Sequence, residues 1–364
     1  MPTPNTRSSP TRIAFVGTGY RARLLCAVAM ALPDRFDVTG MLSRRGADAD
    51  ALPPRLDDVR ELLATRPDLV IVTAPPEARE QLVDRIVATG THVLLETPPA
   101  TERAGLERIA KRAASLPLVH VAEQYPRHPM TAARIAAIRA GAIGVVSSAE
   151  VSQAQTYHAV AVLRAVLDAG RGPVTVRAVQ HTAPLVGPYS RTGWTGETTP
   201  MPSATTLATI DFGASLGRYD FTDGQTRNPL RSFRFLARGS TGELVDDRIV
   251  ALTERDTVVD SMILRRDLGG HGDFERRELV QITLDGTVLW QNAFFGAGLS
   301  DEELAITDML AAAVAWARDD GPGPYPLDEA IHDAALGLAI DEAASTGRAV
   351  RVEPVVFNRD HAPS

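Results

Sequence analysis

Residues 14–22 read Ala-Phe-Val-Gly-Thr-Gly-Tyr-Arg-Ala, and an apolar strand pattern runs into the glycines of this stretch. A helical apolar pattern over residues 24–32 follows, which is the order of a dinucleotide-binding turn. Gly17 permits the tight turn, Gly19 lets the backbone approach a pyrophosphate, and the small Ala22 allows helix and strand to pack closely. Because a helix N-terminus offers free N–H groups to phosphates, the stretch predicts the first turn of a Rossmann domain.

Bulk composition limits the classes of protein that the chain can be. It has 364 residues, 44% of them hydrophobic, and a net charge of −7, which is unlike a nucleic-acid-binding surface. Cys26 is the single cysteine, so no internal disulfide is expected. No apolar run approaches the roughly 20 residues that span a bilayer. Residues 1–9 lack the apolar segment of a signal peptide, so we expect a cytoplasmic protein with a disordered tail over 1–9.

Apolar strands and helices alternate regularly up to residue 125. Strands are predicted at 36–42, 69–73, 92–95 and 118–122, with helices at 58–64, 80–89 and 104–114 between them. Continuous apolar strands of this kind indicate a parallel sheet covered on both faces. Ligands bind at the carboxyl ends of such strands. The predicted Rossmann domain therefore spans residues 10–125.

The end of the second strand indicates the cofactor. An Asp or Glu about 20 residues after the glycines holds the ribose 2′-hydroxyl of NAD. Ser43, Arg44 and Arg45 stand there instead, and guanidinium groups suit a 2′-phosphate. We therefore favour NADP(H) and keep NAD(H) as possible, while Arg44 and Arg45 could also be solvated loop residues.

Residues 126–364 are predicted to form a second α/β domain. A helix at 129–139 is followed by β-rich runs at 145–152, 174–181, 205–212, 217–221 and 232–237, and then by a hairpin around Asp285-Gly286. Helices are predicted at 307–318 and 327–344, and a long mobile loop at 187–202 around Trp194. Hairpin-linked strands favour a mostly antiparallel sheet that follows the parallel one.

Several of these residues together resemble one known family. They are Gly17-x-Gly19-x-x-Ala22, Thr73-Ala74-Pro75-Pro76, Glu96-Thr97-Pro98, His158 and the closing residues 341–347. The sequence resembles the glucose-fructose oxidoreductase, inositol dehydrogenase and rhizopine-catabolism (Gfo/Idh/MocA) family. The resemblance implies a Rossmann domain, a C-terminal α/β domain with a large open sheet for substrate binding and oligomerisation, and a nicotinamide cofactor in the cleft between them.

The catalytic positions depart from the family pattern. The resemblance implies a lysine where Thr97 stands and an aspartate where Ala154 stands. Lys111, the only lysine of the chain, lies on the predicted helix after this loop. His158 keeps its place at a helix start, and Tyr125 could act as a general acid, although it could also be a packed aromatic residue.

The sequence therefore predicts an NAD(P)-dependent oxidoreductase acting on a small polar substrate such as a sugar, cyclitol or imine. A relative of thiazolinyl imine reductases is the closest enzymatic alternative, and a dinucleotide-binding protein without turnover, regulatory or scaffolding, is the alternative from another class. We expect no metal, nucleic-acid or membrane partner, and a homo-oligomer, dimer or tetramer. The predicted site residues are His158 and Tyr125 for catalysis, Arg127 and Trp194 for substrate, and Gly17, Thr18, Gly19, Tyr20, Arg21, Ala22, Ser43, Arg44, Arg45, Thr73, Ala74, Pro75, Glu96, Thr97 and Gln124 for cofactor.

Overall fold

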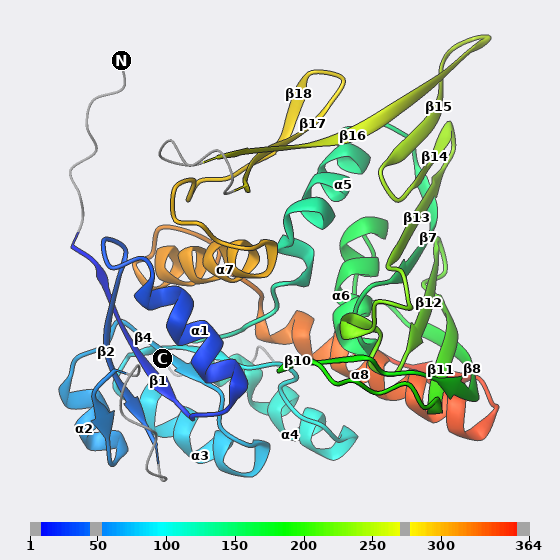
Figure 1. Cartoon of the computed structure of the whole chain (residues 1–364). Helices are drawn as coiled ribbons and strands as arrows, with labels where there is room; N and C mark the ends of the chain where they lie inside the picture. Colours follow the sequence, from blue (N-terminus) through cyan, green and yellow to red (C-terminus); the bar gives the residue numbers. More distant parts are fainter. Residues whose placement is uncertain (1–8, 44–52, 270–276, 355–364) are drawn as a thin grey trace.

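The computed structural model describes residues 9–43, 53–269 and 277–354. A smaller parallel sheet and a much larger, mostly antiparallel sheet lie side by side, with helices packed on each (Figure 1). The predicted α/β fold with a Rossmann domain and a second domain built on a large sheet is confirmed. The predicted disordered tail at 1–9 lies almost entirely outside the described residues.

The first sheet has the strand order β3-β2-β1-β4-β5-β6, and all its strands are parallel. The order reverses between β1 and β4, which is where a doubly wound sheet binds its ligand. The strands are β1 (Thr11–Val16), β2 (Phe36–Leu42), β3 (Arg55–Leu56), β4 (Leu69–Val72), β5 (His92–Leu95) and β6 (Val119–Val121). The helices between them are α1 (Tyr20–Met30), α2 (Val59–Ala64), α3 (Pro76–Val87) and α4 (Arg103–Arg112).

Both faces of this sheet are buried, which explains the unbroken apolar strands. In β4, Val70 and Val72 pack in the cluster that includes α2, α3 and α4. Leu69 and Ile71 alternate with them and pack in the cluster of α1 and α7 (Asp301–Ala317). Side chains of successive strand residues point to opposite faces, so a strand covered on both sides must be apolar throughout.

Helix α7 comes from the second half of the chain but covers the first sheet (Figure 1). It begins at Asp301, earlier than the Thr307 expected from the sequence. Ser300 and Glu303 form a reciprocal capping box at its start. This Ser-x-x-Glu pattern is a helix-start signal that the apolar pattern alone did not reveal.

The second sheet has eleven strands in the order β18-β17-β16-β15-β14-β13-β7-β12-β11-β8-β19. Only the β12–β7 pair is parallel. The strands are β7 (Val146–Ser152), β8 (Val174–Leu185), β11 (Met201–Asp211), β12 (Leu216–Thr222), β13 (Arg234–Gly239), β14 (Gly242–Val245), β15 (Arg248–Glu254), β16 (Thr257–Gly269), β17 (Arg277–Leu284), β18 (Thr287–Gln291) and β19 (Val350–Val352). Its helices are α5 (Pro129–Arg139), α6 (Thr156–Leu167) and α8 (Leu327–Thr346).

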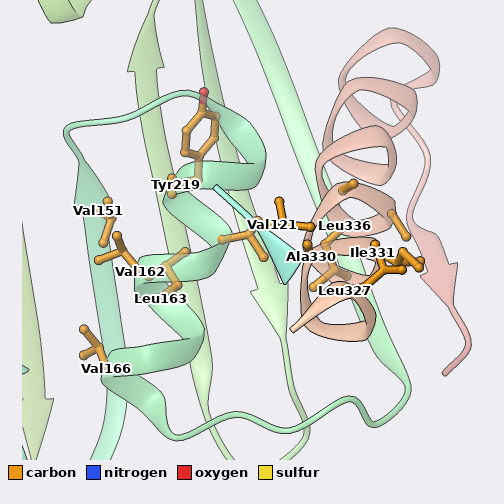
Figure 2. Packing of buried hydrophobic residues seen from close by; sticks show 14 of the residues in the cluster. Val121, Val151, Val162, Leu163, Val166, Tyr219, Leu327, Ala330, Ile331 and Leu336 are labelled. Atoms are coloured by element: carbon orange, nitrogen blue, oxygen red, sulfur yellow. The ribbon is translucent and has the colours of Figure 1, made fainter. Parts of the chain in front are cut away.

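A continuous apolar core joins the two sheets through α6 and α8. Leu163 of α6 and Leu336 of α8 are fully buried. Val121, at the end of β6, points into the same packing layer between these helices (Figure 2). The carboxyl end of β6 is therefore held directly against helices of the second domain.

Two parts of the second domain differ from the sequence prediction. The segment expected as a mobile loop at 187–202 contains a short hairpin of β9 (Tyr189–Ser190) and β10 (Gly193–Trp194), and β11 begins at Met201. Strands β14, β15, β16 and β19 were not predicted. In β16 most residues are exposed, so the polar–apolar alternation that reveals a half-buried strand is missing.

Other expectations concern absences and single residues. No helix in the described part is long and apolar enough to cross a membrane. Within the described ranges, no group of three His, Cys, Asp or Glu side chains could hold a metal ion. Cys26 is buried in α1, and burial raises the pKa of its thiol to about 11. Lys111 is exposed on α4.

Candidate active site

The glycine turn between β1 and α1 has the geometry that the sequence predicts. Gly17 has a φ of 109°, in the region that favours glycine, and a Cβ there would lie 2.5 Å from Thr73 Oγ1. Gly19 is the N-cap of α1 with a φ of −66°, and a Cβ there would meet no atom within 4 Å. No side chain caps α1, and its first turn has no acidic residue. The turn therefore leaves space and N–H donors for an anionic group.

The loops that follow β4 and β5 are held together beside this turn by one buried arginine. Arg79 donates from Nε to the carbonyl of Ala74 at 2.6 Å. One of its amino groups donates to the carbonyls of Glu96 at 3.1 Å and Pro98 at 2.6 Å. The Thr73 hydroxyl donates to the carbonyl of Val16 at 2.9 Å, which ties the β4 loop to the end of β1. Three strand ends thus form one rigid edge.

Arg21 links the glycine turn to the ends of β5 and β6. Its Nε donates to Glu96 Oε1 at 3.0 Å, and one amino group donates to Gln124 Oε1 at 2.7 Å. Glu96 is 8% exposed, and burial raises the pKa of its carboxyl although the charge of Arg21 opposes this. The second oxygen, Glu96 Oε2, is buried and has no hydrogen-bond partner among the described residues.

These residues fit a dinucleotide. A buried carboxylate oxygen without a donor is costly, and ligand hydroxyl or amide groups are suitable donors for it. The open space at Gly19 and the uncapped start of α1 suit a pyrophosphate. Ala22 is fully buried under the turn, as expected for a position where helix and strand pack closely.

His158 lies in the first turn of α6 and is held by a carboxylate. Its Nδ1 lies 2.6 Å from Glu123 Oε2, and Glu123 is 3% exposed. The other oxygen, Glu123 Oε1, accepts the backbone N–H of Tyr125 at 2.9 Å. Because a carboxylate accepts, Nδ1 carries the hydrogen, and Nε2 is left as the ring nitrogen that can exchange a proton.

Tyr125 lies directly beside His158. The two ring centroids are 4.3 Å apart at an interplanar angle of 35°. Burial and the nearby charge of Glu123 raise the pKa of the Tyr125 phenol to about 12. The phenol therefore keeps its proton at neutral pH and can donate it in a hydrogen bond.

Tyr157 completes the cluster on the other side of His158. Its ring centroid lies 4.3 Å from that of His158, and its side chain hydrogen-bonds to Thr97. Burial, more than the charge of Glu123, raises the pKa of this phenol. A phenol and a hydroxyl thus meet at the position of Thr97, where the family resemblance implies a lysine. Ala154, where it implies an aspartate, is fully buried.

The remaining predicted residues have varied surroundings. Ser43 is buried at the end of β2, whereas Arg44 and Arg45 lie outside the described residues. Arg127 is ion-paired with Asp308 of α7 at 2.6 Å and donates to the carbonyl of Pro324 at 3.0 Å. With these contacts, the Arg127 guanidinium joins α7 to the segment around Pro324.

The sequence interpretation missed Glu123 and Tyr157 as members of the site. Both had a signal: Glu123 follows a buried parallel strand, at the edge where ligands bind, and Tyr157 immediately precedes His158. The sequence could not show that Glu123 pairs with His158, because the two residues meet only when α6 packs against the end of β6.

The fold and the glycine turn define the chain as a Rossmann-type nucleotide-binding protein. Residues 11–124 match a family model described as an oxidoreductase family with an NAD-binding Rossmann fold, that of the Gfo/Idh/MocA proteins. This match covers the N-terminal domain and agrees with the resemblance found in the sequence. No curated protein matches the sequence significantly.

Solved structures share the fold over nearly the whole chain. A myo-inositol dehydrogenase from Corynebacterium glutamicum is 19% identical with a TM-score of 0.61, covering 95% of this chain and 99% of its own. An oxidoreductase from Agrobacterium radiobacter, solved with NAD⁺, L-tartaric acid and magnesium, is 14% identical with a TM-score of 0.65, covering 93% and 98%. Levoglucosan dehydrogenase with NADH and levoglucosan is 16% identical with a TM-score of 0.64, covering 94% and 99%. At these low identities the comparisons show a shared fold, and this shared fold includes the second domain.

Proposed function

We propose that the protein is an oxidoreductase that transfers a hydride between a nicotinamide cofactor and a small polar substrate. The observation that carries this proposal is the Glu123–His158 pair beside Tyr125, next to the rigid edge that fits a dinucleotide. A buried carboxylate that orients a histidine is an arrangement used in acid–base catalysis.

The proposed chemistry divides hydride and proton between cofactor and protein. A bound nicotinamide supplies the hydride acceptor or donor. In the reducing direction, the oxygen or nitrogen of the substrate that gains negative charge takes a proton from His158 Nε2 or from the Tyr125 hydroxyl. Glu123 keeps the ring orientation of His158 and stabilises its charged form, and the Tyr157–Thr97 pair orients the substrate from the other side.

Thr97 stands where the family resemblance implies a lysine, and this difference affects which substrates we propose. A C=N or conjugated acceptor needs a weaker proton donor than a simple carbonyl, so an imine joins sugars and cyclitols among the proposed substrates. The dehydrogenases of similar fold, named for myo-inositol and levoglucosan, support the cyclitol and sugar classes.

We keep NADP(H) as the favoured cofactor because Ser43, Arg44 and Arg45 follow the second strand without an acidic residue. NADH and NADPH titrations followed by fluorescence test this preference directly. Equal affinity, or tighter binding of NADH, would contradict it. A location in the cytoplasm stays a prediction from the sequence.

We also propose a homo-oligomer through the open face of the large sheet. Val179 of β8 and Leu207 of β11 are paired in register and are 62% and 47% exposed. In β8, Val174, Val176 and Ala178 are buried against the helices. Val179 follows in alternation, so its side chain points to the opposite, open face of the sheet. A second copy of the chain would cover these two apolar side chains, which lie among charged residues such as Arg177 and Arg218.

The experiment is a screen of sugars, cyclitols and cyclic imines for NADPH or NADH consumption, and for reduction of the oxidised cofactors, by the purified protein. With a substrate in hand, His158→Ala should lower turnover about 10²- to 10⁴-fold and leave cofactor affinity unchanged. Arg255→Gln, in the exposed turn between β15 and β16, is the control. Unchanged turnover in His158→Ala would remove it from the mechanism. Cofactor binding without turnover across the screen would favour the non-catalytic alternative.

A further inference from the structure

A pocket of about 400 Å³ lies between the β9–β10 hairpin and the segment that starts at η3 (Gln225–Arg227). Its lining includes Tyr189, Trp194, Arg227, Arg231 and Phe233. This volume is within the range of small-molecule sites. The nucleotide-binding edge described above does not include it.

Two observations relate this pocket to the candidate active site. Burial raises the pKa of the Tyr125 phenol to about 12, and the charge of Arg227 is among those that oppose this increase. At the tip of the hairpin, the Arg191 guanidinium lies 4.5 Å from the ring centroid of Tyr20, the first residue of α1. The hairpin reaches from the ends of β8 and β11 toward the first domain (Figure 1). The hairpin that forms one wall of the pocket therefore contacts the start of α1, which follows the glycine turn.

The arginines of the pocket have no acidic partner. Neither Arg227 nor Arg231 forms an ion pair with any described residue, and no carboxylate lines the pocket. The only side-chain hydrogen bond of Arg231 among the described residues goes to the neighbouring carbonyl of Leu230 at 3.1 Å. Arg127, by contrast, is ion-paired with Asp308. Two uncompensated guanidinium groups in one pocket suit a carboxylate or phosphate.

Aromatic side chains form the other part of the lining. Trp194 is 74% exposed, Phe233 52% and Tyr189 44%. Tyr189 and Trp194 meet edge to face with ring centroids 5.4 Å apart, so they support each other. Exposed aromatic faces gathered at a pocket favour the stacking of a flat or ring-shaped ligand.

The base of the pocket is fixed by buried amides. Gln225 is 2% exposed; its Nε2 donates to Ser152 Oγ and to the carbonyl of Ser232, at 3.0 and 3.1 Å. Asn228 donates from Nδ2 to the carbonyl of Val186 at 2.8 Å, which joins this segment to the start of the hairpin. Such side-chain anchors hold the arginine-bearing segment in place before a ligand binds, which lowers the entropic cost of binding.

We propose that this pocket is the specificity subsite of the enzyme and that the substrate carries a carboxylate or phosphate together with a flat or ring-shaped portion. Arg227 and Arg231 bind the anionic group, and Trp194 and Phe233 stack on the ring. The inference rests on the proposed oxidoreductase function, because only an enzyme has a substrate. The binding site itself is testable without turnover.

The test measures binding of small probes to the purified full-length protein by calorimetry and by tryptophan fluorescence. Benzoate and phenyl phosphate are the charged probes, and benzamide is the neutral probe of the same shape as benzoate. We expect both charged probes to bind at least tenfold more tightly than benzamide. Their affinity should fall as salt concentration rises, because exposed charges are screened.

Two sets of variants separate the charge from the ring. Replacing both arginines, Arg227→Gln with Arg231→Gln, should reduce benzoate affinity to that of benzamide, whereas Trp194→Ala should weaken both probes. Arg255→Gln, in the exposed turn between β15 and β16, is the matched control and should change neither. Equal binding of benzoate and benzamide, no binding of any probe, or an equal loss in the control would overturn the proposal.

The outcomes also distinguish this inference from the proposed function. Arginine-dependent binding of benzoate without any cofactor turnover would support the subsite and contradict the oxidoreductase proposal. Turnover of uncharged sugars, unchanged in the double arginine variant, would support the oxidoreductase proposal and overturn the subsite.

Discussion

Gly17→Ala should destabilise the protein because the glycine turn is both left-handed and crowded. At a φ of 109° an alanine is strained, which costs roughly 1–3 kcal/mol. The added Cβ would also lie 2.5 Å from Thr73 Oγ1, and forcing an atom into packed surroundings typically costs about 1–3 kcal/mol more. The free energy of unfolding should therefore fall by about 2–6 kcal/mol, measured by urea denaturation without cofactor.

Two matched variants make this prediction specific. Gly19→Ala has an allowed φ of −66° and free space, so its stability should change by less than about 1 kcal/mol. Its NADPH affinity should nevertheless fall at least tenfold, because the methyl group stands where a pyrophosphate would approach. Adding Thr73→Ala to Gly17→Ala removes the crowding oxygen. The double variant should therefore regain the part of the unfolding free energy that the close contact with Thr73 Oγ1 had cost. The reasoning would be refuted if the Gly17→Ala variant were as stable as the unmodified protein, or if it lost less stability than the Gly19→Ala variant.

Three further predictions follow from the same structure. Glu123→Gln should lower turnover by about a hundredfold, because His158 loses the charged partner that orients its ring; unchanged turnover would contradict a catalytic role of the pair. His332 is fully buried, and burial lowers its pKa to about 4, so its contribution to stability is complete above pH 6.5 and lost as the pH falls toward 4, by roughly 3 kcal/mol. His332→Leu should flatten the dependence of the urea midpoint on pH over this range, and an unchanged slope would argue against it. Val179→Lys should yield monomers in analytical ultracentrifugation, with the exposed Arg255→Gln as control, whereas an unchanged mass would exclude this face as the interface.

The Rossmann domain could be predicted closely because its signals are local. The strands at residues 36–42 and 92–95 have the expected bounds, and both end in apolar residues directly before a polar segment. Helix α3 starts at Pro76, earlier than the predicted residue 80, because proline in the first turn is compatible with a helix and was taken as loop.

The second domain was predicted less completely. Strands with one solvated face, such as β16, show little apolar alternation, and their pairing depends on neighbours far away in sequence. The hairpin at Tyr189–Trp194 lies in a segment rich in glycine and proline, where composition indicates a loop. Local patterns carry little information where pairing partners decide the structure.

By itself, the sequence determined the glycine turn: residues 17–22 set it through backbone conformations and spacing that need no distant partner. It also placed His158 and Tyr125 near the ends of the elements that carry them. Only the tertiary structure decided which groups act together. Glu123 meets His158, Tyr157 meets Thr97, and Arg21 meets Glu96 across elements separated by tens of residues. The physical reason is that local conformation follows from short-range sterics, whereas hydrogen bonds between side chains depend on the packing of α1, α6 and the strand ends into one core.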